Sequence, residues 1–305
     1  MRYGKGAVAL AVMLLGGCAS APLAKVATPQ GEAVVLRDGS TELTCVPDIG
    51  RVMSFSRKGE ANLLWTNPAA TNPTVWSNYG GDKTWPWPQD VLWSWPPPTK
   101  IDPGPYRETG VPNGFRLEGS ADPVTGLAAS RETTLAGGIV QNIYSFTRRA
   151  ESKRGKVTSG VAAWAITQTA GEGTVYVRRN AGAAESAVTR LMGAALTVQP
   201  AGPRWVKLDP PTASGKIGLP GSAVAVRRGD RVLLIERVEP IAPTDPWANV
   251  TAQIYAYRDG ANDDHYTELE LIGPTRPLAL GESVSLHTEW QILEGAAFDR
   301  MLAAP

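Results

Sequence analysis

Residues 126–149 read GLAASRETTLAGGIVQNIYSFTRR, two alternating runs on either side of one glycine pair. The runs 126–134 and 139–149 are typical of half-buried strands, and Gly137-Gly138 is a favourable two-residue turn. The stretch therefore predicts a β-hairpin.

The same kind of pattern continues on both sides of this hairpin. Asp38-Gly39 and Gly229-Asp230 are further tight-turn signals, and the chain holds 32 glycines and 25 prolines. The other strands that we expect are 33–37, 41–46, 50–56, 62–65, 114–118, 160–169, 174–178, 223–228, 231–237, 251–257, 265–272 and 282–293. Only residues 296–302 have the period of a helix. The sequence thus predicts an all-β fold, a large β-sandwich of two antiparallel sheets.

Residues 79–98, YGGDKTWPWPQDVLWSWPPP, hold four of the ten tryptophans. Because proline lacks a backbone N–H, we expect a long loop over about 70–112 rather than a helix or a central strand. Indole rings beside Asp82, Lys83 and Gln89 suit a sugar ring, which has an apolar face and a hydroxyl edge. The same tryptophans could instead close the end of the core, since large aromatic residues often serve packing alone.

The N-terminus has the order of a bacterial lipoprotein signal peptide over residues 1–18. Arg2 and Lys5 precede an apolar run over 7–15, which is short for a membrane span, and a Leu-Gly-Gly-Cys box ends at Cys18. Lipidation of Cys18 would anchor the chain to a membrane through buried acyl chains. Ala19 after the cysteine resembles the signal for the outer membrane, facing the periplasm of the cell envelope. Residues 19–30 are expected to be a flexible tether.

Charge and metal-ligand patterns exclude two classes of partner. The chain has 30 basic and 29 acidic residues without a long basic run, so nucleic acid is not expected. The Asp263-Asp264-His265 cluster has no further spaced ligand motif, so no metal is predicted. No cofactor motif stands out either.

Three stretches carry a resemblance to a known superfamily. They are LTCVPDIGRVMSF at 43–55 with NLLW at 62–65, NYGGDKTWP at 78–86, and YTELELIGP at 266–274 followed by LALGES at 278–283. Together they resemble the galactose-mutarotase-like (aldose 1-epimerase) superfamily. Within it the chain looks similar to a family of exported bacterial proteins with a Gly-Gly-Asp-Lys-x-Trp-Pro element. The resemblance implies one supersandwich domain over 31–295, a concave carbohydrate-binding face, and a C-terminal tail at 296–305.

The chain departs from active mutarotases in its histidines. Enzymes of the superfamily use a histidine acid and a carboxylate base. Past the signal peptide only His265 and His287 are present, both late in the chain, so the catalytic roles are not carried over. Activity stays open, and if present it would be isomerisation of the mutarotase or epimerase type. Asp82, Glu270 and His287 are the weak catalytic candidates.

The candidate ligand-binding residues come mainly from the Trp/Pro stretch. They are Asp82, Lys83, Trp85, Trp87, Gln89 and Trp93, with Arg51 added because a guanidinium can bind a carboxylate. Alternation places Glu268 and Glu270 on one strand face with Tyr266, and it places His287 on a polar face. The leading hypothesis is an envelope lipoprotein that binds a carbohydrate. The alternative is a structural or assembly lipoprotein that binds a protein partner through the Trp/Pro loop.

Overall fold

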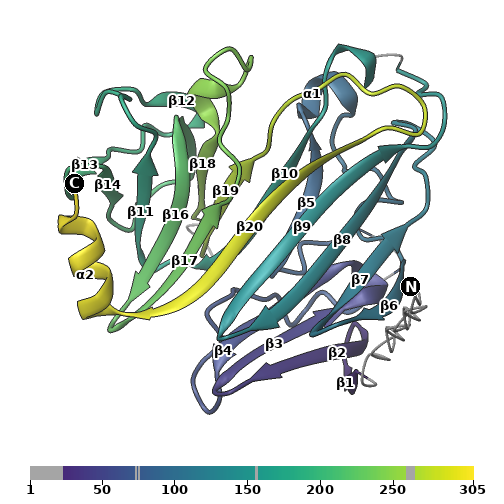
Figure 1. The fold of residues 1–305 in the computed structure, drawn as a ribbon, viewed down its shortest axis with the longest axis horizontal. Coiled ribbons are helices and arrows are strands. Elements are labelled where there is room, and N and C mark those ends of the chain that lie inside the picture. Colours follow the sequence, from purple (N-terminus) through teal and green to yellow (C-terminus); the bar gives the residue numbers. More distant parts are fainter. Residues whose placement is uncertain (1–22, 73, 75, 155–156, 259–264) are drawn as a thin grey trace, which may run out of the picture.

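Two ten-stranded antiparallel sheets pack face to face in the chain (Figure 1). The structure is a computed structural model that describes residues 23–305 apart from 73, 75, 155–156 and 259–264. A single large apolar core lies between the sheets and draws side chains from both. The expectation of an all-β sandwich is therefore confirmed.

The first sheet, called the pocket sheet below, carries the candidate site. Its strands in spatial order are β1 (Ala24–Thr28), β2 (Gly31–Asp38), β3 (Thr41–Val46), β4 (Arg51–Arg57), β5 (Asp82–Trp87), β10 (Ala162–Ala170), β19 (Tyr266–Ile272), β18 (Ala252–Tyr257), β15 (Gly215–Leu219) and β12 (Thr189–Gly193).

The second sheet faces the viewer in Figure 1. Its strands in spatial order are β13 (Gln199–Pro200), β14 (Trp205–Leu208), β11 (Thr174–Arg179), β16 (Gly221–Arg228), β17 (Arg231–Arg237), β20 (Ser283–Glu294), β9 (Ile139–Arg148), β8 (Leu127–Ala136), β7 (Gly114–Gly119) and β6 (Tyr106–Val111). The helices are α1 (Gln89–Leu92) and α2 (Gly295–Ala303), with single 3-10 turns at Pro47–Ile49, Val157–Ser159 and Ala248–Val250.

The hairpin predicted around Gly137-Gly138 is present as β8 and β9. Ala136 pairs with Ile139, so the glycines form a two-residue loop, and both have positive φ (61° and 75°). Positive φ at both loop positions matches the twist of the flanking strands and costs glycine little. Along β8 buried and half-buried residues alternate, as one face of the strand packs on the core.

The Trp/Pro stretch contains a strand that the sequence reasoning missed. β5 lies between β4 and β10, and it pairs with β10 from Asp82 to Trp87 but with β4 only at one position. The carbonyl oxygen of Pro86 accepts the indole N–H of Trp93 at 2.8 Å, so this carbonyl points away from β10. The missing N–H of Pro86 is therefore not needed by the ladder, and the loop prediction for this segment is corrected.

Another expected strand, 62–65, is an irregular turn. The side-chain oxygen of Asn62 accepts the backbone N–H groups of Phe55 and Leu64, both at 3.0 Å. Asparagine side chains stabilise turns in this way and compete with strand pairing.

The N-terminal expectations fall in two parts. Residues 1–22, including the lipobox at Cys18, lie outside the described residues. The tether was expected to reach residue 30, but residues 24–28 pair with β2 as the edge strand β1. Within the described part of the chain, no helix has the length and apolar character needed to cross a membrane.

Candidate functional site

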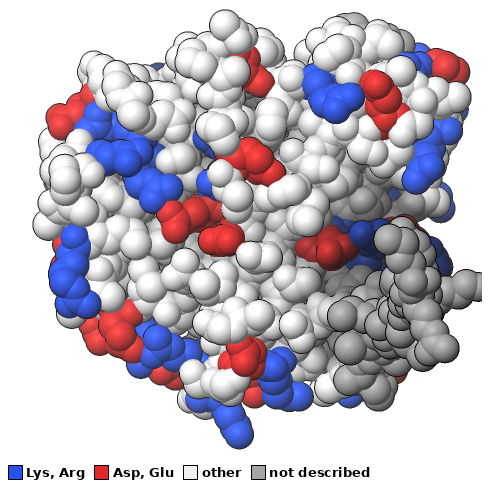
Figure 2. Space-filling model, viewed as in Figure 1, with Lys and Arg blue, Asp and Glu red and all other residues white. Residues whose placement is uncertain are grey.

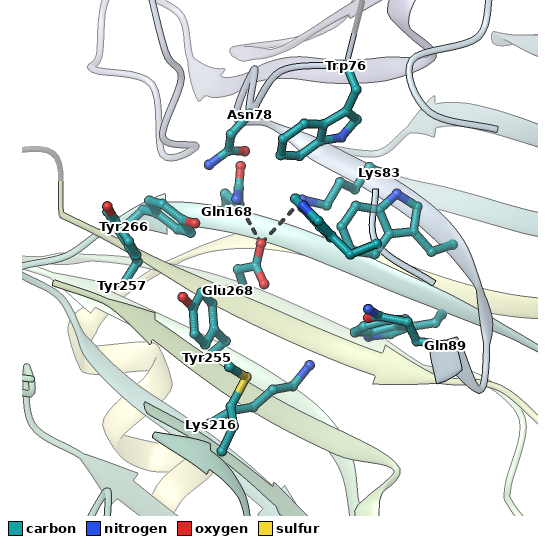
Figure 3. Close-up of a pocket in the computed structure, with 14 residues that line it drawn as sticks. Trp76, Asn78, Lys83, Gln89, Gln168, Lys216, Tyr255, Tyr257, Tyr266 and Glu268 are labelled. Atoms are coloured by element: carbon teal, nitrogen blue, oxygen red, sulfur yellow. Dashed lines mark hydrogen bonds and ion pairs between the residues drawn. The ribbon is translucent and has the colours of Figure 1, made fainter. Parts of the chain in front are cut away.

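A pocket of about 340 Å³ opens on the face of the pocket sheet that points away from the core (Figure 3). Its floor comes from β5, β10, β19, β18 and β15, and its rim from the segments just before β5 and just after α1. The lining side chains are Trp76, Asn78, Lys83, Trp85, Gln89, Trp95, Trp164, Gln168, Met192, Lys216, Tyr255, Tyr257, Tyr266 and Glu268.

Strand register brings one row of polar side chains across this floor. Tyr255 on β18 lies opposite Glu268 on β19, which lies opposite Gln168 on β10. Lys216 on β15 lies opposite Tyr255 and extends the row. Since directly opposite residues have Cβ atoms about 5 Å apart, these side chains present a continuous polar strip.

Glu268 is the centre of the row. Its Oε1 accepts the Nε2 amide of Gln168 at 2.8 Å and pairs with Nζ of Lys83 at 3.3 Å. Figure 3 shows both partners converging on this carboxylate. The Lys83 ammonium also lies 4.4 Å from the centre of the Trp85 ring. Burial lowers the pKa of Lys83, while the nearby Glu268 carboxylate opposes that change.

A second lysine–carboxylate pair supports the floor from below. Glu270 is fully buried, and its Oε2 pairs with Nζ of Lys216 at 2.8 Å and accepts the indole N–H of Trp164 at 2.7 Å. Burial is the largest cause that raises the pKa of Glu270 to about 7, and Lys216 opposes it. Glu270 does not line the pocket itself, but both of its partners do.

Aromatic side chains form two walls around the polar strip. On one side Trp85 and Trp164 meet edge to face at 5.6 Å, and Trp76 and Trp95 do so at 4.5 Å. Tyrosines line the opposite side, where Tyr257 stacks on Tyr266. Edge-to-face packing holds indole rings in defined planes, so the wall is preorganised.

Two of the predicted ligand-binding residues that adjoin each other point to opposite faces. Asp82 and Lys83 are successive residues of β5, and side chains alternate along a strand. Lys83 faces the pocket. Asp82 is fully buried between the sheets, where it pairs with Arg131 at 2.7 Å and accepts the hydroxyls of Thr167 and Tyr144. Asp82 is thus an internal anion in this structure.

Arg51 takes a structural place behind the pocket. It is fully buried and its Nη2 donates to both carboxylate oxygens of Asp102, at 2.7 and 2.8 Å. The same carboxylate accepts the indole N–H groups of Trp85 and Trp76. The predicted guanidinium–carboxylate pair therefore exists inside the protein, where it orients two indoles of the wall.

The remaining predicted residues divide between the pocket and other places. Trp85 and Gln89 line the pocket with Lys83. Trp93 is buried against Pro86, and Trp87 packs between Trp164 and Trp247 without reaching the pocket.

The catalytic candidate His287 lies on the other sheet. Its Nδ1 is 2.7 Å from Oε1 of Glu239, and no described residue of the pocket lining is a histidine. His287 on β20 is therefore remote from the Lys83–Glu268 pair.

Sequence reasoning did not single out several lining residues. Gln168, Lys216 and Tyr255 lie on strands far apart in the chain, and only the register brings them together. Trp95 could have been found, since it is the last tryptophan of the Trp/Pro stretch, whereas the alternation of β10 does not mark the face of Trp164 as polar.

Comparisons with known proteins give a fold but no close relative. No family model matches the chain, and no curated protein matches it either. Solved structures do match. A galactose mutarotase related enzyme from Lactobacillus acidophilus aligns with a TM-score of 0.53 at 8% identity, over 85% of this chain and 97% of its own. A galactose mutarotase-like protein from Clostridium acetobutylicum aligns at 0.52 and 9%, over 89% and 98%. At such low identity the likeness shows the fold, a galactose mutarotase-like sandwich.

Proposed function

We propose that this chain binds a carbohydrate in the pocket. The observation that carries the proposal is Glu268 on the polar strip, bound by Gln168 and Lys83 and enclosed between an indole wall and a tyrosine wall. The apolar face of a sugar ring fits against an indole, while the carboxylate and amide of the strip bind its hydroxyl groups. The fold shared with mutarotase-like proteins supports the same class of ligand.

Calorimetric titration with a panel of neutral mono- and oligosaccharides tests this proposal. Once a ligand is found, Glu268→Gln removes a charged acceptor and should weaken its binding by about tenfold or more. Glu118→Gln makes the same chemical change at a partly exposed carboxylate on β7 of the second sheet, outside the pocket lining, and should leave the affinity unchanged. A panel without any ligand, or an equal loss in both variants, would contradict the proposal.

Isomerisation of a bound sugar is a second candidate, favoured by the Lys83–Glu268 pair. Glu268 is a carboxylate that faces the pocket, and burial lowers the pKa of the Lys83 ammonium beside it. In ring opening, Glu268 would take the proton of the anomeric hydroxyl, Lys83 would protonate the ring oxygen, and the bond between the anomeric carbon and the ring oxygen would break. Anomer exchange followed by NMR decides, because wild-type rates equal to those in buffer would exclude it.

We also propose that the chain is a lipoprotein of the bacterial envelope, anchored at Cys18. The support is the charge, apolar run and Leu-Gly-Gly-Cys order of the N-terminus. Cells fed labelled palmitate should yield a labelled, membrane-associated protein. Cys18→Ala should abolish the label, and equal labelling of both forms would contradict the anchor.

Binding of a protein partner stays a candidate because Trp95 at the pocket rim is 56% exposed. Exposed tryptophans frequently anchor protein interfaces. In that case a stoichiometric partner should co-purify with the wild type and be lost with Trp95→Ala. Sugars added to the wild type should leave its melting temperature unchanged.

A further inference from the structure

A second cleft, of about 690 Å³, lies apart from the pocket and shares no lining residue with it. It is formed at the edge of the sheet where β11 and β17 end and β16 begins, and the loops over 180–187 and 238–249 close its sides. Three arginines line it, Arg178, Arg204 and Arg237, against the single carboxylate of Glu239. Basic side chains gather at the upper left in Figure 2, over the upper end of β11.

Arg237 is the least ordinary of these arginines. Its side chain is only 5% exposed, yet no carboxylate among the described residues forms an ion pair with it. It donates through Nε and Nη1 to two backbone carbonyls, those of Glu239 at 2.9 Å and Ile272 at 3.3 Å. Burial lowers its pKa to about 10. A buried charge is costly unless an opposite charge accompanies it, so the site is short of an anion.

The acidic groups nearby are already engaged elsewhere. Glu239 binds His287 through both oxygens, pairing with the ring Nδ1 at 2.7 Å and accepting the backbone N–H at 3.2 Å. Glu236 pairs with Arg178, whose Nε also donates to Ser222.

Arg204 is exposed, and within the described part of the chain it makes no ion pair. The cleft therefore keeps two guanidinium groups, on Arg204 and Arg237, that form no ion pair with a described carboxylate, although the charges of Glu239 and Asp245 raise the pKa of Arg237 against the effect of burial.

We propose that this cleft is a second binding site, for a ligand whose anionic groups are bound by Arg204 and Arg237. Guanidinium groups bind phosphate, sulfate and carboxylate oxygens through charge-assisted hydrogen bonds. The volume lies within the range of small-molecule sites, so a free phosphate fills only part of it. A larger molecule that bears a phosphate, sulfate or carboxylate group is the class of ligand that fits. The site is independent of the carbohydrate pocket.

Calorimetry with pyrophosphate tests the charge requirement. The whole protein should bind pyrophosphate with a dissociation constant on the order of millimolar or lower. Arg204→Gln should raise this constant about tenfold or more because a charged donor is lost. Arg149→Gln removes an equal charge at an exposed position just after β9, outside the lining of the cleft, so its affinity should equal that of the wild type. Absence of binding, or an equal loss in both variants, overturns the proposal.

Two further arms identify the geometry and the source. Arg237→Lys keeps the charge but loses the planar donor group, so it should bind pyrophosphate more weakly; its melting temperature should fall because the bonds to two backbone carbonyls are lost as well. If this variant unfolds, the Arg204→Gln result decides alone. Succinate and phenyl phosphate, neither of which is a sugar, then separate a carboxylate from a phosphate ester as the preferred group, and an affinity for both that Arg204→Gln leaves unchanged refutes an anion site in this cleft.

Discussion

Replacing Asp82 by alanine should lower the free energy of unfolding of this sandwich strongly, and it should not remove a ligand contact. Asp82 on β5 reaches across the interior to Arg131 on β8 of the opposite sheet, and both side chains are at most 3% exposed. The carboxylate also accepts hydroxyl hydrogen bonds from Thr167 at 2.6 Å and Tyr144 at 3.0 Å. One anion thus satisfies three buried donors that belong to both sheets.

The size of the effect follows from what the alanine leaves behind. Arg131 would stay buried without its counter-charge, and breaking such a pair by removing one partner costs ~3–5 kcal/mol. The two hydroxyls would each lose an acceptor, a loss of ~1–3 kcal/mol that overlaps with the first because the groups form one network. We expect a total near 5 kcal/mol, a large share of the ~5–15 kcal/mol that stabilises a typical domain.

Urea unfolding followed by circular dichroism measures this quantity. Asp82→Ala should lower the unfolding midpoint strongly, with a melting temperature roughly 10 °C or more below that of the wild type. Adding Arg131→Met should restore part of the loss, because the unpaired cation is then gone. A single variant within about 1 kcal/mol of the wild type, or a double variant much worse than the single, would refute this account of Asp82.

Further changes test other parts of the structure. The folded-state pKa of Glu270, about 7, exceeds the ordinary 4.5, so the folded protein binds an extra proton between these values and loses roughly 3 kcal/mol of stability as pH rises through them. Denaturant titrations at pH 5 and pH 8 should show this slope in the wild type and a flatter one in Glu270→Gln. Gly80→Ala should destabilise the protein by at least ~1–3 kcal/mol, since φ is +83° and a Cβ would approach a backbone carbonyl oxygen to 2.3 Å; a neutral result in thermal melting would contradict it. Phe298→Ala should cost ~3–5 kcal/mol because this fully buried ring of α2 packs edge to face on Tyr176 and Trp205, whereas a melting curve like that of the wild type would mean that α2 is dispensable.

The regular part of the fold could be predicted from alternation and turn chemistry. The bounds of β3 and β17 agree with the sequence, and the Gly137-Gly138 hairpin lies where the glycine pair indicates. The sequence does not predict β15 because Gly215 and Gly218 weaken its pattern. Glycine is tolerated at both positions because the Ala194 backbone and the Val250 side chain approach closely and leave no room for a Cβ.

The site could be predicted only in part, for a reason that lies in β5. Proline argues against a central strand, so the sequence predicts Asp82 and Lys83 as neighbours on one loop. Once the segment is a strand, alternation separates them and leaves only Lys83 in the pocket. Alternation predicts that Glu268 shares a strand face with Tyr266, and both line the pocket, but the partners of Glu268 on β10 and β5 depend on pairings between distant segments, which a single sequence does not reveal.

The indole wall gives the protein an internal optical reporter. Four tryptophans line one pocket, Trp76, Trp85, Trp95 and Trp164. The indole N–H of Trp164 donates a hydrogen bond to the Glu270 carboxylate. Indole emission depends on the polarity and the quenching groups around the ring, so a solute seated against these rings changes the fluorescence spectrum of the unlabelled protein. Occupancy of the pocket can therefore be followed by light alone, and a shift that vanishes with Trp95→Phe would locate the bound solute at the rim.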